Sequence, residues 1–546
     1  MGLLTLVEDR PTPSSVYNWR VYLCAAVASC ASIAIGYDSA FIGTTIALPS
    51  FASEFGLSKM TSTHKALISA NIVSVYQAGA FFGSLFAYPM SFYLGRKKSL
   101  SIFSLFFLVG SGIMLGANGH RGLGLIIGGR VLAGLGVGGA SMNVPIYISE
   151  LAPPAIRGRL VGIYELGWQI GGLVGFWINY GISETMTPGW HQWIIPFAIQ
   201  LIPGGMLFVG SFFLKESPRW LLSKNRREEA LKNLCWMRQL PTDDIYIVEE
   251  VGLIDAAITA DTSRVGNGVL APFKAAARDR KVLYRLFLGG ILFMWQNGSG
   301  INAINYYSPT VFKSIGLQGT NASFFTTGLF GVVKTTLTII WLLVLIDRFG
   351  RRNLLMAGAL GGSVCMFILG AYVYKTNPTA HASDVHAKLT PAGTAAIFFF
   401  YLWTAFYTPS WNGTPWVLNS EIFDNSTRAL GQASAAANNW FWNFIISRFT
   451  PTMFLKMGKS GCGVYFFFAS MMIASVVFVY LLIPETKGVP LEFMDRLFEI
   501  KPVSSAHGIV IQEAHERDEE FRHDAEGAAL DLTKEKAVHV ERTMAV

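Results

Sequence analysis

The sequence predicts an all-α membrane protein with twelve transmembrane helices in two six-helix halves. Of its 546 residues, 52% are hydrophobic and 14% are charged, whereas soluble domains average about 25% charged residues. Twelve apolar stretches approach or exceed the roughly 20 residues that cross a bilayer, and none alternates with a period of two. These observations argue against a soluble enzyme, a disordered chain and a β-barrel.

The twelve expected spans follow one another with short connections, except for one long polar stretch between the sixth and the seventh. In chain order, spans 1 to 12 are expected at residues 21–48, 67–92, 100–117, 123–147, 160–182, 193–214, 283–308, 323–346, 354–374, 392–419, 431–455 and 463–483. Each is justified by an apolar run that is long enough for a helix and is bounded by charged, Gly or Pro residues.

The remaining segments are polar and are expected outside the bilayer. Residues 215–282 predict a linker of short amphipathic helices, such as 226–238, between an N-terminal half (21–214) and a C-terminal half (283–483). Residues 1–20 predict a short N-terminal segment. Residues 484–546 predict a largely disordered tail, because they are charged and lack long apolar runs.

Cationic residues mark one side of the membrane. Lys and Arg gather after the even-numbered spans, at Arg96–Lys98, Arg157, Arg159, 215–285, Arg348, Arg351, Arg352 and Arg428. Cytoplasmic loops carry this excess, so both termini and the linker are expected in the cytoplasm. The net charge of +8 is explained by this topology, and no nucleic-acid partner is expected.

Motifs of catalysis and cofactor binding are missing from the sequence or stand in the wrong context. The five cysteines form no CxxC pair and no zinc spacing, and they are interpreted as small apolar packing residues. The run 134–139 fits GxGxxG but lies inside an apolar span, so it predicts close helix packing. No phosphate-binding loop and no nucleophile–base set is present. We therefore expect no enzyme activity, no cofactor, no metal and no direct use of ATP.

The two halves repeat each other. Gly95-Arg96 after span 2 corresponds to Gly350-Arg351 after span 8, and Glu216 after span 6 corresponds to Glu485 after span 12. Glutamate and arginine seven residues apart follow both span 4 and span 10, as Glu150 with Arg157 and Glu421 with Arg428. A duplicated six-span unit predicts two parallel halves with a substrate site between them near the midplane.

These motifs resemble those of the sugar porter family of the major facilitator superfamily. The resemblance covers roughly residues 20–500 and is carried by GRKK at 95–98, PIYISELAP at 145–153, ESPRW at 216–220 and PETKG at 484–488. It implies the major facilitator fold and a secondary transporter of the plasma membrane, which we expect to be monomeric. The runs 19–22, 36–45 and 409–416 narrow the resemblance to carriers of quinate, an anionic cyclic polyol, and imply quinate as the substrate with protons as the coupled ion. In the family, ion pairs at the cytoplasmic span ends close the inner gate. The matching residues are Arg96, Glu150, Arg157, Glu216, Arg351, Glu421, Arg428 and Glu485.

Charges within the spans need a partner or a function, because a charge at the bilayer centre costs about 2.5–3.5 kcal/mol on insertion scales. Asp38 lies in the middle of span 1 and Arg130 at the start of span 4. Proton-coupled sugar porters have Asp and Arg at these motif positions, and this implies that Asp38 carries the proton while Arg130 switches its affinity. A permanent structural pair is the alternative.

Polar residues in spans 7, 10 and 11 are expected to bind the substrate. Two glycines weaken span 7 beside Gln296, Asn297 and Asn302, and amides suit a polyhydroxy solute. Family positions in spans 10 and 11 match Trp416 and Asn439. For the nearby Trp411, a ring contact and ordinary packing both stay open.

Two departures from the family pattern define the expected substrate class. Glu165 stands where sugar carriers have Gln, and Lys334 stands where they have Asn. An anionic polyol needs a cation in a dry site, so Lys334 is expected to bind the substrate carboxylate. Glu165 is then its partner in the empty site or an acceptor for ring hydroxyls. A purely structural Glu165–Lys334 pair is the alternative.

Two other functions remain open at this point. One is a proton-coupled or facilitative carrier of a neutral sugar. The other is a nutrient sensor that binds its ligand without transport and signals through its tail.

Overall fold

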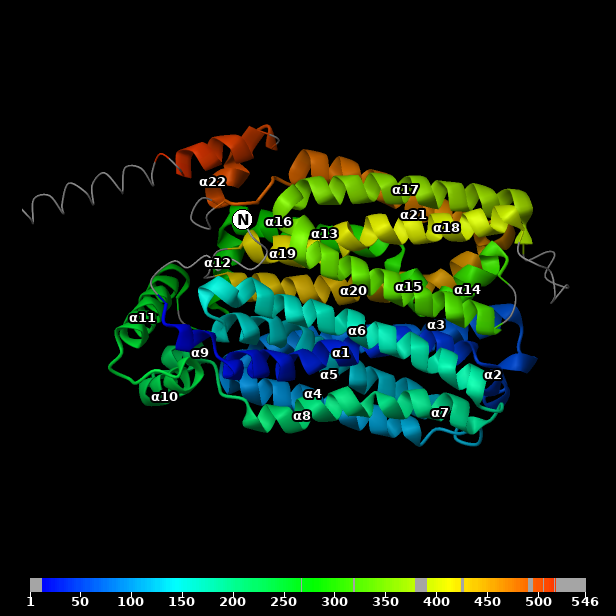
Figure 1. The fold of residues 1–546 in the computed structure, drawn as a ribbon, viewed down its shortest axis with the longest axis horizontal. Helices are drawn as coiled ribbons and strands as arrows, with labels where there is room; N and C mark the ends of the chain where they lie inside the picture. Colours follow the sequence, from blue (N-terminus) through cyan, green and yellow to red (C-terminus); the bar gives the residue numbers. More distant parts are fainter. Residues whose placement is uncertain are drawn as a thin grey trace, which may run out of the picture.

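The computed structural model describes residues 12–516 except 267, 318–319, 379–389, 424–426, 490–493, 504 and 515. All regular structure in the described part is helical, and every one of the twelve expected spans is one helix or a run of two or three helical elements (Figure 1). The sequence prediction of an all-α bundle is therefore confirmed.

The first half contains spans 1 to 6. They are α1 (Trp19–Ala47), α3 (Ser62–Leu94), α4 (Arg96–Leu115), α5 (Gly124–Leu151), α6 (Arg157–Thr185), and α7 (Trp190–Ile199) followed by α8 (Leu201–Phe213). Short elements before and between them are η1 (Ser14–Tyr17), α2 (Pro49–Glu54), η2 (Leu57–Lys59) and η3 (Pro154–Ile156).

The second half contains spans 7 to 12, three of which are interrupted. Span 7 is α13 (Arg280–Gly298) with α14 (Ile301–Ile315), and span 8 is α15 (Thr320–Ile340), the π-helical η4 (Trp341–Leu345) and α16 (Ile346–Phe349). Span 10 is α18 (Pro391–Tyr407), the π-helical η6 (Thr408–Asn412) and α19 (Thr414–Glu421). Spans 9, 11 and 12 are α17 (Arg351–Thr376), α20 (Arg428–Lys456) and α21 (Cys462–Leu482), with η7 (Lys459–Gly461) between the last two.

The interruptions fall where the sequence weakens the helix. Gly300 separates α13 from α14 with a φ of +91°, a conformation that costs little for glycine. In span 10, the π-helical turn contains Pro409, Trp411 and Asn412, and Gly413 follows it. Such π-helical turns are frequent at functional sites, and this one faces the first half of the molecule through Asn412.

Eight helices of the described part are long and apolar enough to cross a membrane by length and composition. Spans 5, 7, 10 and 11 fall short of that length or apolarity. These are the spans that carry Glu165, Gln296, Asn412 and Asn439, and their lower hydrophobicity reflects the polar site that they build.

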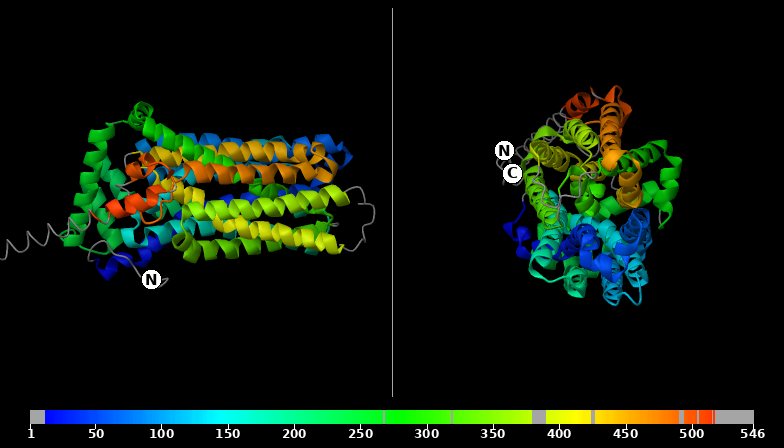
Figure 2. Two further views of the ribbon diagram at one scale, coloured as in Figure 1. Left: turned by 90° about the horizontal axis from the view of Figure 1, so that it is seen from above. Right: turned by 90° about the vertical axis from the view of Figure 1, so that its right-hand side faces the viewer.

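The two halves lie side by side along the length of the bundle, as Figures 1 and 2 show. They meet through equivalent helix pairs: α6 packs on α15, and α3 packs on α20. Because α6 and α15 are spans 5 and 8, and α3 and α20 are spans 2 and 11, each contact pairs the fifth span of one half with the second span of the other.

Small residues set the close approach of helices in the first half. A Cβ atom on Gly138 of α5 would lie 1.9 Å from the backbone oxygen of Ala80 in α3, and one on Gly134 would lie 2.1 Å from that of Tyr76. The interpretation of the GxGxxG run as a packing surface is thus confirmed.

We expect Gly138→Ala to destabilise the bundle by about 1–3 kcal/mol, because an added methyl group forces α3 and α5 apart. The thermal unfolding midpoint of the purified protein in detergent measures this effect. Gly128→Ala in the same helix is the control, since a Cβ there meets nothing within 4 Å. Equal midpoints for the two variants would contradict the packing role of Gly138.

The linker and both ends of the described chain lie at the same end of the bundle (Figure 1). The linker forms α9 (Pro218–Ser223), α10 (Arg227–Arg238), α11 (Ile245–Val265) and α12 (Ala271–Arg278), and α10 coincides with the amphipathic helix expected at 226–238. The cationic span ends gather at this end too, as the positive-inside pattern requires.

The beginning of the predicted tail is folded. Its helix α22 (Met494–Glu499) and the helical residues 505–514 share a small hydrophobic cluster of Val489, Met494, Leu497, Ala506 and Val510. Glu499 also pairs with Lys281 at the start of α13, with 2.5 Å between Nζ and Oε1. Residues 517–546, and with them the prediction of disorder there, lie outside the described residues, as do residues 1–11 of the N-terminal segment.

Candidate functional site

A narrow cavity lies between the two halves. Helices α1 and α6 of the first half and α14 and α15 of the second half line it. Its polar lining residues are Ser39, Gln169, Asn305 and Lys334, and its aromatic ones are Trp168 and Phe176. Hydroxyl, amide and ammonium groups beside flat aromatic faces suit a polyhydroxylated ring that carries a negative charge.

Lys334 supplies the cation of this cavity. Its side chain is buried, with 7% of the residue exposed. Within the described part of the chain, its ammonium group has no hydrogen bond and no ion pair closer than 4 Å, and its interaction with Glu165 is a longer-range electrostatic one. A direct Glu165–Lys334 pair, expected either as a purely structural pair or as the partnership of the empty site, is therefore not the arrangement seen here.

Glu165 forms its contacts with amides instead. Its Oε1 accepts hydrogen bonds from Nε2 of Gln169 at 2.9 Å and from Nδ2 of Asn412 at 2.7 Å. Gln169 is four residues further along α6, and Asn412 belongs to the interrupted span 10. The second bond therefore joins the two halves of the molecule.

The expected amides of span 7 are brought together with Asn439. Asn297 donates from Nδ2 to Oδ1 of Asn439 at 3.3 Å, and Asn302 donates to Oδ1 of Asn297. Gln296 donates from Nε2 to the backbone oxygens of Trp411 and Asn412, both at 2.8 Å. Gln296 therefore holds the backbone segment that presents Asn412 to Glu165.

The two tryptophans of span 10 differ in their surroundings. Trp416 is partly buried and packs edge-on against Phe293 with ring centroids 4.7 Å apart, and it also packs against a hydrophobic cluster that contains Met142 of the first half. Trp411 is 1% exposed and donates its indole N–H to the backbone oxygen of Leu355. Trp411 is thus a core residue of the second half, and packing is the correct alternative for it.

Asp38 and Arg130 form a fully buried bidentate pair, at 3.1 and 3.2 Å between nitrogen and oxygen. Arg130 also donates from Nε to the backbone oxygen of Ile72, and its guanidinium lies over the ring of Tyr76. Ser39, the neighbour of Asp38, lines the cavity. Asp38 is therefore next in sequence to a lining residue, while the pair itself is buried outside the cavity lining.

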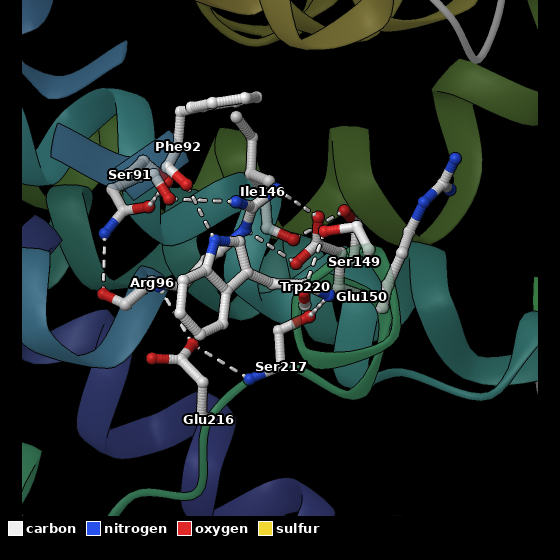
Figure 3. Close-up of polar contacts among 12 residues, drawn as sticks. Ser91, Phe92, Arg96, Ile146, Ser149, Glu150, Glu216, Ser217 and Trp220 are labelled. Carbon is white, nitrogen blue, oxygen red and sulfur yellow. Dashed lines mark hydrogen bonds and ion pairs between the residues drawn. The ribbon is translucent and has the colours of Figure 1, made fainter. Parts of the chain in front are cut away.

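The repeated motifs form two equivalent clusters at the linker end of the bundle. In the first, Arg96 makes a bidentate pair with Glu150, with 2.7 Å between Nη2 and Oε1, while Glu216 accepts the backbone N–H groups of Arg96 and Lys97 (Figure 3). Gly95 has a φ of +91° here, and a Cβ would come within 2.4 Å of the Glu216 carboxylate. Burial raises the pKa of Glu216, and the backbone donors of Ser217, Lys97 and Arg96 oppose that rise.

The second cluster repeats this geometry. Arg351 pairs with Glu421 at 2.8 Å, and Glu485 accepts the backbone N–H groups of Arg351 and Arg352. Gly350 takes a φ of +81°. Each of these pairs lies within one half, so the pairs hold the span ends of a half together.

The remaining predicted gate residues begin helices at the same end. Arg157 begins α6 and Arg428 begins α20. Asp261 of α11 pairs with Arg219 at 3.0 Å and interacts electrostatically with Arg428. Because Arg219 lies in α9 of the linker, this contact links the linker to a charge of the second half.

Several polar residues of the site were not predicted. Gln169, Asn305 and Asn412 enter it through tertiary contacts between distant spans. The spacing of four residues between Glu165 and Gln169 on one helix was the signal that could have identified Gln169.

A bundle of membrane-spanning helices with a polar cavity between two equivalent halves defines a secondary transporter. A family model described as "Sugar (and other) transporter" matches residues 24–498. The chain belongs to this family, whose members are transporters of the major facilitator superfamily and not enzymes.

Similar proteins agree with this assignment. Proteins named "Probable quinate permease" from Aspergillus clavatus and Aspergillus niger are 65% and 63% identical to this chain over 526 and 543 residues. The first alignment covers 96% of both chains, and the second covers 100% of this chain and 99% of its relative.

Solved structures of the xylose transporter XylE have the same fold. The "proton:xylose symporter XylE bound to 6-bromo-6-deoxy-D-glucose" is 28% identical, with a TM-score of 0.71 and coverage of 88% of this chain and 99% of that one. The inward-open form from E. coli is 26% identical, with a TM-score of 0.69 and coverage of 88% and 100%. The predicted major facilitator fold is confirmed.

Proposed function

We propose that this transporter imports quinate together with protons by alternating access. The observation that carries the proposal is the buried ammonium of Lys334 in the cavity between the halves. A buried cation without a close partner favours an anionic ligand, because the ligand carboxylate compensates its desolvation. The names of the Aspergillus relatives support quinate as that anion.

Each predicted residue has a role in this proposal. Lys334 binds the carboxylate, while Glu165, Asn297, Asn302 and Asn439 form hydrogen bonds to ring hydroxyls. Gln296 contributes by positioning Asn412, and Trp416 forms an apolar wall. Asp38 carries the coupled proton, and Arg130 is the cation from which it separates during the cycle. The similarity to XylE, a proton:xylose symporter, supports this coupling.

The clusters around Arg96 and Arg351 let each half move as a unit. Each of these partly exposed ion pairs contributes about 0–1 kcal/mol to the stability of the state in which it forms. Together with Arg157 and Arg428, contacts at this end bias the balance between outward-facing and inward-facing states. The protein is proposed to act as a monomer in the plasma membrane, with both termini in the cytoplasm, because the cationic span ends gather beside the linker.

Uptake of labelled quinate and labelled glucose into vesicles, with and without an imposed proton gradient, tests the function. We expect gradient-dependent accumulation of quinate and little uptake of glucose. Preferential accumulation of glucose would instead identify a sugar carrier, a function that the glucose analogue bound to XylE makes a specific second candidate. Binding of quinate with no uptake in either condition would identify a sensor.

Trp416→Ala is expected to raise the apparent KM for quinate about fivefold with little change in stability. Loss of one ring contact costs about 1 kcal/mol, and Trp416 is only partly buried. Initial rates over a range of quinate concentrations measure the effect. An unchanged KM in a folded variant would show that Trp416 does not line the site.

A further inference from the structure

The carboxylate of Glu165 has one occupied and one available oxygen. Oε1 accepts both amide hydrogen bonds, from Gln169 and from Asn412. Within the described residues, Oε2 accepts no hydrogen bond, and the side chain is partly exposed. Amide N–H groups only donate, so Oε1 stays an acceptor whether Glu165 is ionised or protonated. A proton on this residue would therefore reside on Oε2.

The charges around Glu165 come from several elements. Lys334 of α15 is the cation that interacts with it, and Tyr164 of α6 and Tyr407 of α18 are the other titratable groups that do so in the described part of the chain. Asp38 and Arg130, on the neighbouring α1 and α5, are paired with each other. The empty site therefore contains one negative charge on Glu165 and one positive charge on Lys334. Neither has a closer charged partner in the described residues, and the site is neutral overall.

Arrival of an anion changes this balance. Once a substrate carboxylate binds the Lys334 ammonium, the site holds two carboxylates and one cation between the two halves. An uncompensated buried charge is costly, and a second carboxylate beside the first favours protonation of one of them.

We infer that Glu165 is a second proton site, which takes up one proton on Oε2 when the substrate carboxylate binds Lys334. The inference rests on the proposed function. In balanced form, the ionised Glu165, a proton and the quinate anion give a protonated Glu165 and a bound quinate–Lys334 pair. Release of quinate on the other side returns the proton to water and restores the ionised Glu165.

This step fixes the charge that moves in each cycle. One proton on Asp38, one proton on Glu165 and one quinate anion sum to a net charge of +1. Import then responds to the membrane potential as well as to the pH gradient. A single proton with one quinate would carry no net charge, and import would be indifferent to the potential.

The test is the number of protons per quinate, measured in proteoliposomes at equal pH on both sides. Quinate is placed in tenfold excess inside, and the potential that stops net quinate flux is determined. With two protons, an inside-negative potential of about 59 mV balances the tenfold gradient. We expect this potential in wild type, and we expect Glu165→Gln to transport quinate with one proton fewer and no response to the potential.

Glu184→Gln is the matched control, because Glu184 lies exposed at the far end of the same helix. It should keep the wild-type value. An equal proton number in wild type and Glu165→Gln would overturn the inference while leaving proton-coupled quinate import intact. Absence of quinate transport in wild type would refute the proposed function and the inference with it.

The inference can also be tested without a folded Glu165→Gln protein. Wild type and Asp38→Asn then give the answer, since Asp38 accounts for only one of two protons. Two protons in wild type and one in Asp38→Asn would support Glu165 as the second site. One proton in wild type and none in Asp38→Asn would overturn it.

Discussion

Lys334→Asn is expected to reduce quinate uptake by roughly 30-fold or more, whereas a neutral ring polyol is tolerated better. Removal of one partner from a buried charge pair costs about 2–5 kcal/mol. Lys334 is buried in the cavity, with no closer partner in the described residues than the electrostatic interaction with Glu165. Competition of quinate and its uncharged amide against labelled quinate, in wild type and variant, measures the change in preference.

The variant Glu165→Gln with Lys334→Asn separates this role from a structural one. If Lys334 serves only to compensate Glu165, the single Lys334→Asn change should impair folding and the double change should restore it, with the preference for the anion intact. Retained preference for quinate over its amide in the double variant would rule out Lys334 as the carboxylate partner. The search would then move to Arg130 or another cation.

Asp38→Asn is expected to reduce accumulation of quinate against its gradient, because the proton carried by Asp38 is lost, while exchange of labelled for unlabelled quinate partly survives. Asparagine can accept a hydrogen bond from Arg130 but cannot release a proton. Uphill uptake driven by an imposed pH gradient and exchange at equal pH are measured on the same vesicles. Only the proton-coupled step needs the carboxyl group of Asp38. Uphill uptake should therefore fall, while exchange at equal pH is partly retained.

Stability has to be measured alongside, since Asp38 and Arg130 are fully buried. Breaking such a pair leaves an uncompensated charge and can cost about 3–5 kcal/mol. Asp255→Asn is a suitable control, because it removes the same charge from an exposed pair with Arg227 in the linker. Undiminished uphill uptake in Asp38→Asn would leave the Asp38–Arg130 pair with a structural role only.

The helices could be predicted from the sequence because each span is a long apolar run, and burial in lipid leaves helices as one of few solutions. The folded start of the tail was not expected. Its helix α22 has six residues, too short to give an apolar run, and it is stabilised by contacts with Lys281 and Arg285 of α13, which are 218 and 213 residues away from their partners Glu499 and Phe498. Such contacts leave no local pattern.

The site was predictable in its charges and less so in its hydrogen bonds. A charge within an apolar span is conspicuous, so Asp38, Glu165 and Lys334 could be identified one by one. The hydrogen-bond partner of Glu165 in span 10 could not be identified in this way. Asn412 reaches Glu165 from the other half of the molecule, through a π-helical turn. The same turn places Trp411 in the core and Asn412 against Glu165 of the first half, a difference that adjacent positions in a sequence do not reveal.

The most direct measurement of proton-coupled import is the pH of an unbuffered medium around de-energised vesicles when quinate is added. Coupled uptake predicts that the medium becomes more alkaline as quinate is imported, that a protonophore abolishes the change, and that glucose does not produce it. Uptake of labelled quinate with no change in external pH would contradict proton coupling.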